Sequence, residues 1–168
     1  YARNNKIPFL GICYGMQMAI IEFARNKLNL KKATSSEFDK KGLHIIGLIN
    51  EWTKNGRKFK GTDKNLGGTM RLGSYDAKLK ENSMIKKIYK KNLIKERHRH
   101  RYEVDISFKE KFEKNGMIFS GLSPDGELPE IIELRNHPWV IGVQFHPEFK
   151  SSHLAPHPLF SSCIKASN

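Results

Sequence analysis

Gly11-Ile12-Cys13-Tyr14-Gly15-Met16-Gln17 decides the fold, and it directly follows the apolar run Ile7-Pro8-Phe9-Leu10. The apolar run is typical of a short buried strand, and apolar residues at helical spacing follow over residues 16–26. A glycine two residues to either side of Cys13 leaves room for a tight strand-to-helix turn that exposes the cysteine. A lone cysteine at a strand end is more often a buried structural residue, but the paired glycines and this context favour a reactive one. The segment therefore predicts a nucleophile elbow, in which the helix N-terminus favours the thiolate.

A second segment, near the other end of the chain, supplies a base for this nucleophile. A buried-strand pattern over residues 139–145 is followed by His146-Pro147-Glu148. In extended backbone, residues two apart point the same way, so Glu148 can reach and orient the imidazole of His146. A carboxylate that orients a histidine, which in turn deprotonates a thiol, is the arrangement of a catalytic triad. A histidine before proline is a weak signal by itself, but together with the elbow it predicts a Cys-His-Glu triad.

These two motifs resemble those of the class I, triad-type glutamine amidotransferases. Three further segments are similar to the glutaminase domain of the CTP synthase family and occur in that family's order. They cover residues 65–73, 96–104 and 136–139. The resemblance runs from Tyr1 to the C-terminal region, and other amidotransferases share the elbow and the His-Pro-Glu but not these three segments.

The resemblance implies roles for individual residues. Cys13 is the expected nucleophile that forms a glutamyl thioester, His146 is the base and then the acid, and Glu148 is the orienting carboxylate. The residues expected to contact the substrate glutamine are Tyr14, Gly15, Met16, Gln17, Glu37 and Arg101. Glu37 is expected at the α-amino group and Arg101 near the α-carboxylate, which agrees with the two charges of an amino acid. Arg71 lies in the segment that the resemblance associates with a response to GTP.

The resemblance also implies partners. L-glutamine is the expected substrate, and ammonia is expected to pass through an internal channel to an N-terminal amidoligase domain of the same polypeptide. That domain would use ATP and Mg²⁺ to convert UTP to CTP, with GTP as an activator of glutamine hydrolysis. The complete enzyme would be a homo-oligomer, a tetramer, in the cytoplasm. No cofactor is expected in this domain, and no residue of the chain is assigned to ATP, UTP or Mg²⁺.

Two features depart from the family pattern. Tyr14 stands where the family usually has leucine, which we interpret as tolerated because the main chain there should face the substrate. The chain also begins only a few residues before the elbow strand, without the N-terminal strand, helix and glycine-rich oxyanion loop that the resemblance implies. We therefore expect the C-terminal portion of a longer polypeptide. Alone, the 168-residue chain is expected to associate through an open sheet edge and to be a severely impaired glutaminase.

The pattern along the chain predicts one α/β domain over residues 1–168. We expect three layers, with a mostly parallel central sheet and flanking helices, N-terminally incomplete, because the elbow strand and the His146 strand are near-continuous apolar runs. The predicted strands cover residues 7–12, 43–49, 69–72, 96–104, 117–120, 131–134 and 139–145. The predicted helices cover residues 16–26, 81–90 and 160–166, and an exposed loop is expected over residues 51–64. The sequence has no apolar run long enough to span a bilayer, so no membrane partner is expected.

The formal net charge of +13 raises the question of nucleic-acid binding. Lysines are spread along the whole chain, and no aromatic residues interleave with them as in a single-strand binder. We interpret them as solvated lysines and expect no nucleic-acid partner. The run Arg97-His98-Arg99-His100-Arg101 is denser, and on a strand its arginines share one face and its histidines the other. By itself this run suggests a phosphate or metal site, but the resemblance places Arg101 beside glutamine, so no metal site is expected.

The two cysteines indicate a reducing compartment. A disulfide between Cys13 and Cys163 would consume the proposed nucleophile, so the cytoplasm is expected. Cys163 lies among apolar residues and is expected to be a buried structural thiol.

Three alternative functions remain open from the residues alone. A GMP-synthetase-type glutaminase shares the elbow but not the Gly-Gly-Thr-Met-Arg-Leu-Gly segment or the arginine-histidine run. A γ-glutamyl hydrolase should show a signal peptide or several cysteines. A non-catalytic interaction fragment agrees with the absent oxyanion loop but is opposed by the intact triad.

Overall fold

A computed structural model describes residues 1–48, 51–54, 57–60 and 70–168, of which residues 51–54 and 57–60 are described in backbone only. Its strands are β1 (Phe9–Ile12), β2 (Ala33–Ser35), β3 (Leu43–Leu48), β4 (Glu51–Lys54), β5 (Arg57–Lys60), β6 (Arg71–Leu79), β7 (Leu93–His100), β8 (Tyr102–Val104), β9 (Met117–Leu122), β10 (Pro129–Leu134) and β11 (Val140–Val143). Its helices are α1 (Tyr14–Asn26), α2 (Met84–Tyr89), α3 (Lys109–Lys114) and α4 (Pro158–Ser167), with 3-10 turns η2 (Ile106–Phe108) and η3 (Pro147–Lys150).

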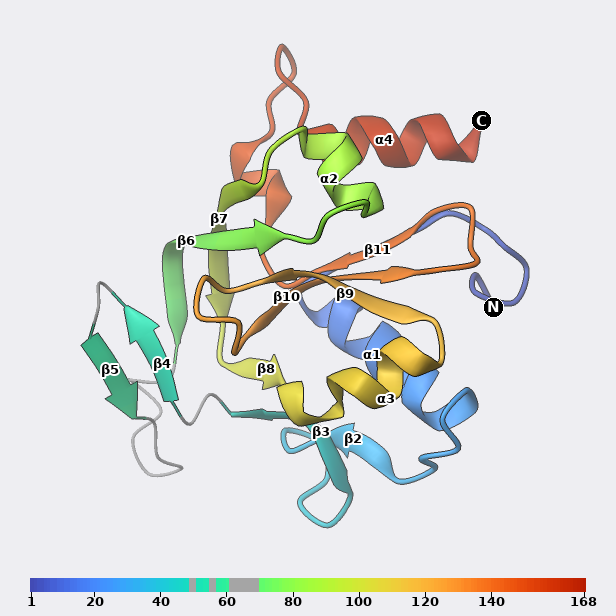
Figure 1. The fold of residues 1–168 in the computed structure, drawn as a ribbon, viewed down its shortest axis with the longest axis vertical. Helices are drawn as coiled ribbons and strands as arrows, with labels where there is room; N and C mark the ends of the chain where they lie inside the picture. The colour runs from blue at the N-terminus through green and yellow to red at the C-terminus, as the bar shows by residue number, and fades with distance from the viewer. Residues whose placement is uncertain (49–50, 55–56, 61–69) are drawn as a thin grey trace.

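The central sheet has six strands in the order β1-β11-β10-β9-β6-β7. Strand β1 pairs with β11 in parallel, and every other neighbouring pair of this sheet for which the structure describes a register is antiparallel. The expectation of a mostly parallel sheet is therefore wrong. Parallel neighbours need a crossover of a dozen residues or more, whereas residues 123–128 and 135–139 are the whole connections from β9 to β10 and from β10 to β11. A smaller sheet, β2-β3-β8, lies beside it (Figure 1).

Apolar side chains pack against both faces of the central sheet, and neighbouring residues of β10 show the division. Ile132 belongs to a cluster with α1 and α3, while Ile131 belongs to a second cluster with α2 and α4. Figure 1 shows α2 and α4 together at one end of the molecule and α1 and α3 near the small sheet. The α/β class is confirmed, and the strands are covered on both sides as their apolar runs predict.

Gly142 of β11 lets helix α1 approach the sheet closely. A Cβ at this position would lie 2.7 Å from Cγ1 of Ile132, closer than real side chains approach, and 3.0 Å from Cγ of Met16, a tight contact. A larger residue here would therefore require β10 and α1 side chains to shift. This contact matters for the site because α1 begins directly after Cys13.

Several local predictions differ from the structure. The exposed loop expected over residues 51–64 contains the hairpin β4–β5 in its described part, and residues 55–56 and 61–64 lie outside the described residues. The strand expected over residues 69–72 corresponds to β6, which continues to Leu79. Polar and apolar residues alternate only weakly in this continuation, so its length was not predicted. Residue 69 lies outside the described residues. The strand expected over residues 96–104 is divided at Arg101 into β7 and β8, which belong to different sheets. Strand β2 and helix α3 were not predicted.

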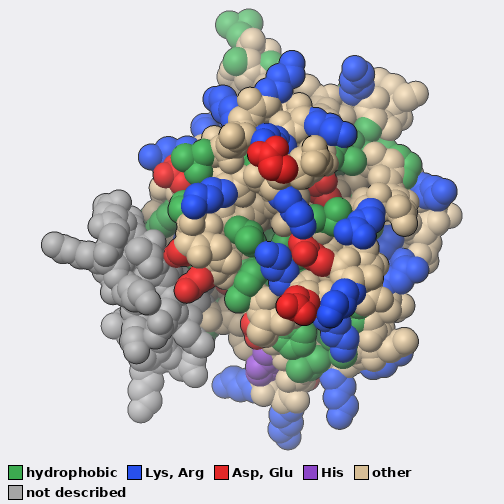
Figure 2. Space-filling model, viewed as in Figure 1, with side chains coloured by type: hydrophobic (Ala, Val, Ile, Leu, Met, Phe, Trp, Pro, Cys, Tyr) green, Lys and Arg blue, Asp and Glu red, His purple; other side chains and the backbone are tan. Residues whose placement is uncertain are grey.

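Cationic side chains are dispersed over the surface. On the face in Figure 2, Lys and Arg side chains are spread among acidic side chains and do not form one basic patch on that face. This distribution agrees with the interpretation of solvated lysines. Within the described parts of the chain, no helix combines the length and the apolar character that crossing a membrane requires.

Candidate active site

Cys13 occupies the turn between β1 and α1 in a strained backbone conformation, with φ 50° and ψ −102°. The turn is held by a hydrogen bond from the Cys13 amide to the Val143 carbonyl at 2.7 Å and one from the Gln17 amide to the Cys13 carbonyl at 3.2 Å. A Cβ on Gly11 would lie 2.9 Å from the backbone of Gly15, so glycine is required for this close approach. A positive φ on a non-glycine residue costs free energy and is often retained at functional sites. The predicted strained strand-to-helix turn at Cys13 is confirmed.

The parallel pairing of β1 with β11 brings the cysteine and the histidine to the same edge of the sheet, since Ile12 lies opposite Val143. Beyond β11, the His146 amide donates to the Arg97 carbonyl of β7 at 2.8 Å. Nδ1 of His146 lies 2.6 Å from Oε1 of Glu148. Nε2 of His146 is buried and has no hydrogen-bond partner within the described residues. An imidazole held at Nδ1 by a carboxylate, with Nε2 unoccupied, is arranged to exchange a proton with a nucleophile.

The contact between His146 and Glu148 is confirmed, but the local backbone differs from the expectation. The segment is not extended: Pro147–Lys150 forms the 3-10 turn η3, with proline in its first turn. Proline fits the start of a helical turn because its missing amide hydrogen would have no partner there. Glu148 thus reaches the imidazole because the chain turns after His146, and not because alternate residues of a strand point the same way.

Polar contacts join β7 to η3 and to residues of α2 and the start of α4. Glu96 of β7 accepts from Nε2 of His157 at 3.2 Å and from the hydroxyl of Tyr89 at 3.2 Å. The ammonium group of Lys150 donates to the carbonyl of Lys95 at 2.6 Å and lies 3.6 Å from Oε2 of Glu96. The Lys150 contacts thus tie η3, which directly follows His146, to β7.

The sulfur of Cys13 lies in a partly buried and polar environment. Burial raises the pKa of the thiol above its ordinary value, the Tyr14 amide and the Gln144 side chain act to lower it, and the charges of Glu103 and Glu148 act with burial. The Tyr14 amide at the start of α1 thus favours the thiolate, as expected of a helix N-terminus, but burial and two carboxylates outweigh it and raise the pKa of the thiol overall. The reaction of this thiol therefore needs a base.

The residues expected around the substrate lie close to the elbow. The Tyr14 side chain is 54% exposed and meets the Phe38 ring edge-on, with the ring centroids 6.0 Å apart. This contact places Glu37, which is exposed, beside the start of α1. Arg101 is half-buried between β7 and β8, next to Tyr102, whose carbonyl accepts from the Gln17 side chain at 3.0 Å. The structure thus brings Glu37, Arg101 and the elbow to one region.

Gly15, Met16 and Gln17, at the start of α1, differ in their surroundings. The Met16 side chain is fully buried in the core, so only its main chain can face a substrate. The Gln17 side chain is also buried, and its amide nitrogen donates to Tyr102 and to Oε1 of Gln144. At Gly15, a Cβ would meet no atom within 4 Å. The space that a side chain at position 15 would fill is therefore open.

Arg71 lies beneath this region in a buried ion-pair network. Its guanidinium, 2% exposed, donates to Glu103 at 2.8 Å and to Glu130 at 2.7 Å, and it stacks over the Tyr75 ring at 4.4 Å. Burial acts to lower the pKa of Arg71, but Glu130 and Glu103 raise it overall. Burial also raises the pKa of both carboxyl groups, against the attraction of the arginine. The charge of Arg71 is therefore balanced inside the domain.

Two buried histidines extend this network toward Tyr102. The Tyr102 carbonyl can only accept, so Nδ1 of His100, 3.2 Å away, carries a proton. Nε2 of His100 then accepts from Nδ1 of His98 at 2.8 Å, which leaves Nε2 of His98 as an acceptor 3.6 Å from Oε2 of Glu130. Burial, reinforced by Arg71, lowers the pKa of His98, and it lowers the pKa of His100 to about 3.

The predicted alternation along β7 is confirmed, but its consequence was missed. Arg97 and Arg99 are exposed, and His98 and His100 face the core. Alternation placed the two histidines on one face but did not identify that face as the buried one, and their partners are distant in sequence. Gln144 was also missed, although a polar residue inside the apolar run 139–145 was a signal that something polar lies beside it.

The buried histidines predict a stability that depends on pH. A histidine whose folded-state pKa is lowered stabilises the fold above its unfolded pKa near 6.5, and this contribution is lost as the pH falls from there toward 3. At pH 5 we expect a loss of about 2 kcal/mol for a histidine that stays neutral in the folded state. Replacing His100 with glutamine should therefore reduce the drop in melting temperature between pH 7 and pH 5. Thermal unfolding followed by circular dichroism at both pH values measures this.

The matched control is His153→Gln, at an exposed histidine. A drop in melting temperature for His100→Gln as large as that of the unsubstituted chain would contradict the assignment of a neutral buried imidazole.

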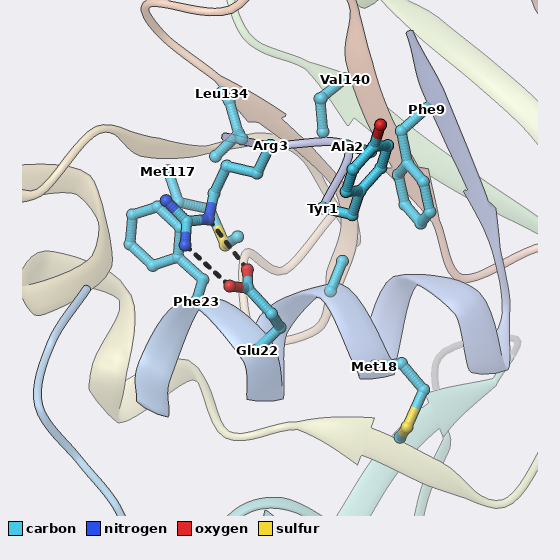
Figure 3. A pocket seen from close by; sticks show the side chains of 11 residues that line it. Tyr1, Ala2, Arg3, Phe9, Met18, Glu22, Phe23, Met117, Leu134 and Val140 are labelled. Carbon is cyan, nitrogen blue, oxygen red and sulfur yellow. Dashed lines mark hydrogen bonds and ion pairs between the residues drawn. The ribbon is translucent and has the colours of Figure 1, made fainter. Parts of the chain in front are cut away.

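A pocket of about 240 Å³ lies away from the triad, between β1, α1 and the N-terminal segment. Figure 3 shows Arg3 paired with Glu22 at this pocket, among apolar side chains that include Phe9 and Met117. The guanidinium contacts the carboxylate through two hydrogen bonds, of 2.9 and 2.7 Å. Cys13, His146 and Glu148 do not line it, so this pocket is not the substrate site.

The chain matches the family model "Glutamine amidotransferase class-I" over residues 1–166, and it therefore belongs to the class I glutamine amidotransferase family. It is 85% identical over 166 residues to the CTP synthase of Pelagibacter ubique (strain HTCC1062), an alignment that covers 99% of this chain and 31% of that protein. The chain thus spans about a third of the length of the curated relatives it matches and corresponds to their glutamine amidotransferase region.

Solved structures agree with this assignment. The glutaminase domain of Trypanosoma brucei CTPS, with bound acivicin, superposes with a TM-score of 0.86 at 34% identity, covering 99% of this chain and 62% of that one. A Thermoplasma acidophilum protein described as a GMP synthase component superposes with a TM-score of 0.57 at 14% identity, covering 99% and 60%. The second likeness concerns the fold alone.

Proposed function

We propose that this chain hydrolyses L-glutamine through a Cys13-His146-Glu148 triad and supplies the ammonia for conversion of UTP to CTP. The observation that carries the proposal is the 2.6 Å contact between Nδ1 of His146 and Glu148, at the strand end adjacent to the strained Cys13. The relatives named CTP synthase support the reaction in which the ammonia is used.

The chemistry follows from the state of each group. The Cys13 thiol gives its proton to Nε2 of His146 as its sulfur attacks the γ-carboxamide carbon of glutamine. The same proton passes to the amide nitrogen, and the carbon–nitrogen bond breaks. Ammonia departs, and a glutamyl thioester remains on Cys13. Water, deprotonated by His146, then attacks the thioester, and glutamate leaves as the thiol is restored. Glu148 holds the imidazole in the required orientation and stabilises its charged form throughout.

Other residues bind the substrate in this proposal. The Tyr14 amide, which already lies at the sulfur, donates to the oxyanion that forms in each step. The exposed Glu37 carboxylate takes the α-amino group, and Arg101 holds the α-carboxylate end. Gly15 leaves the space that the glutamine side chain needs, and the main chain of Met16 and the side chain of Gln17 close the inner end of the site.

The complete enzyme is proposed to join this activity to an amidoligase domain that uses ATP, UTP and Mg²⁺, in a homo-oligomer, a cytoplasmic tetramer. We assign none of those ligands to residues of this chain. GTP is the proposed activator. Because the Arg71 guanidinium is buried and paired, we propose that Arg71 takes part in that response through the network with Glu103 and Glu130.

Replacing Glu148 with alanine tests the triad. In the intact enzyme, glutamine-dependent CTP formation should fall by roughly 10²- to 10⁴-fold, because the imidazole loses its orientation and its countercharge. CTP formation from added ammonia should be unchanged, since it bypasses the thioester. Both rates are measured by the absorbance change on conversion of UTP to CTP.

Glu110→Ala, at an exposed carboxylate of α3, is the matched control. A glutamine-dependent rate for Glu148→Ala equal to that of this control would contradict the catalytic role of Glu148.

A further inference from the structure

Gln144 lies between the strand that ends in His146 and the nucleophile itself. Its side chain is fully buried, and its Nε2 lies 3.6 Å from Sγ of Cys13, an ordinary N···S hydrogen-bond length because sulfur is large. Its backbone amide donates to the Glu130 carbonyl at 2.8 Å, which fixes the main chain from which the side chain extends. A buried amide in contact with the reacting sulfur is more than a core-filling group.

The direction of this hydrogen bond is determined by the residues behind it. The Tyr102 carbonyl can only accept, so Gln17 must direct its amide nitrogen toward it, at 3.0 Å. The second hydrogen on that nitrogen then points to Gln144, 3.3 Å away, and only the oxygen of Gln144 can accept it. Gln144 must consequently direct its own nitrogen toward the sulfur. A backbone carbonyl thus specifies, through two amides, that a donor faces Cys13.

A donor at this place has a definite chemical effect. Hydrogen bonds to a charged acceptor are stronger than those to a neutral one, so an N–H facing sulfur stabilises the thiolate more than the thiol. Burial and the charges of Glu103 and Glu148 oppose the thiolate, and Gln144 acts in the other direction together with the Tyr14 amide. The sulfur of an elbow enzyme needs this help at the moment when its proton moves to His146.

We propose that Gln144 is a further catalytic residue, which donates a hydrogen bond to the Cys13 sulfur as the thiolate forms, and that Gln17 is the positioning residue that fixes its direction. This inference rests on the proposed function, because it takes Cys13 as the nucleophile. In this proposal, the buried amide group of Gln17 orients Gln144, which is a role separate from contact with the substrate glutamine.

The test measures the thiol and the reaction separately in the intact polypeptide that carries this chain. Alkylation of Cys13 by iodoacetamide is followed from pH 5 to pH 10 by mass spectrometry of its peptide. In Gln144→Met, which removes the donor, the midpoint of the alkylation profile should rise by about one pH unit. In Gln144→Glu, which keeps the shape but places an oxygen at the sulfur, the rise should be larger. The kcat/KM for glutamine should fall roughly tenfold in Gln144→Met, mainly through kcat.

Ser120→Ala is the control, because Ser120 is equally buried but lies on β9, which does not neighbour β1 or β11. It should leave the alkylation profile unchanged. An unshifted midpoint in both Gln144 variants would overturn the proposal, and so would a shifted midpoint with unchanged kcat/KM. If Gln144→Met does not fold, Gln144→Glu decides by the same two readings. Failure of the proposed function is recognised separately, as glutamine hydrolysis that survives Cys13→Ala.

Discussion

Replacing Cys13 with alanine is expected to lower glutamine-dependent ammonia release by roughly 10⁴- to 10⁶-fold in the intact enzyme. The reason is that every step of the proposed reaction passes through a bond to this sulfur, which Gln144 and the Tyr14 amide already contact. The backbone at Cys13 should keep its conformation, because the hydrogen bond from its amide to Val143 does not involve the side chain. Release of ammonia is measured by a coupled glutamate dehydrogenase assay.

Two controls make this result specific. Cys163→Ala, on α4 and partly buried against the core, should retain glutamine hydrolysis. CTP formation from added ammonia should survive in Cys13→Ala. Glutamine hydrolysis by Cys13→Ala within tenfold of the unsubstituted enzyme would show that another group is the nucleophile.

Replacing Arg71 with methionine is expected to destabilise the domain by roughly 3–5 kcal/mol. Methionine fills a similar volume but leaves Glu103 and Glu130 without their shared cation, and both carboxyl groups are buried. For a domain of this size, this corresponds to a fall in melting temperature of about 6–20 °C. The loss should be smaller at pH 5 than at pH 8, because the two carboxyl groups can then take up protons. Thermal unfolding at the two pH values measures both effects.

Lys80→Met provides the comparison, since it breaks the exposed ion pair between Lys80 and Glu113. Exposed pairs of this kind contribute about 0–1 kcal/mol. Equal melting temperatures for the two variants would contradict the structural role of the buried network around Arg71.

The parts of the site that sequence reasoning predicted well are those specified by neighbours in the chain. The elbow needs glycine at position 11 for a close backbone approach and a helix directly behind Cys13, and both are visible in one heptapeptide. The contact of Glu148 with His146 lies within three residues. Here the prediction was confirmed even though the segment forms a 3-10 turn and not a strand.

The direction of the strands could not be read from apolar runs alone. A strand covered on both faces has the same composition whether its neighbours are parallel or antiparallel. The apolar runs of β1 and β11, which do pair in parallel, led to the expectation of a mostly parallel sheet. The short connection between β10 and β11 was the available physical signal, because it permits only a hairpin. The lengths of the connections would have predicted the antiparallel direction of these strands.

The polar groups that support the site were also beyond local reasoning. Arg71 meets carboxylates that follow it by 32 and 59 residues, and Gln144 meets Cys13 over a separation of 131 residues. Such contacts depend on the order of strands in the sheet, which the sequence pattern did not predict. The histidines of β7 were a partial exception, because alternation placed both on one face of the strand without showing that this face is buried.

The most direct test of the proposed chemistry is the site of covalent capture by a diazoketone analogue of L-glutamine. The protein is treated with the reagent, digested, and mapped by mass spectrometry, with and without excess L-glutamine. We predict one adduct, on Cys13, that glutamine suppresses, while Cys163, which lies on α4 and not at the elbow, stays unmodified. Predominant labelling of Cys163, or labelling of Cys13 that glutamine does not suppress, would contradict the assignment of a glutamine-hydrolysing triad.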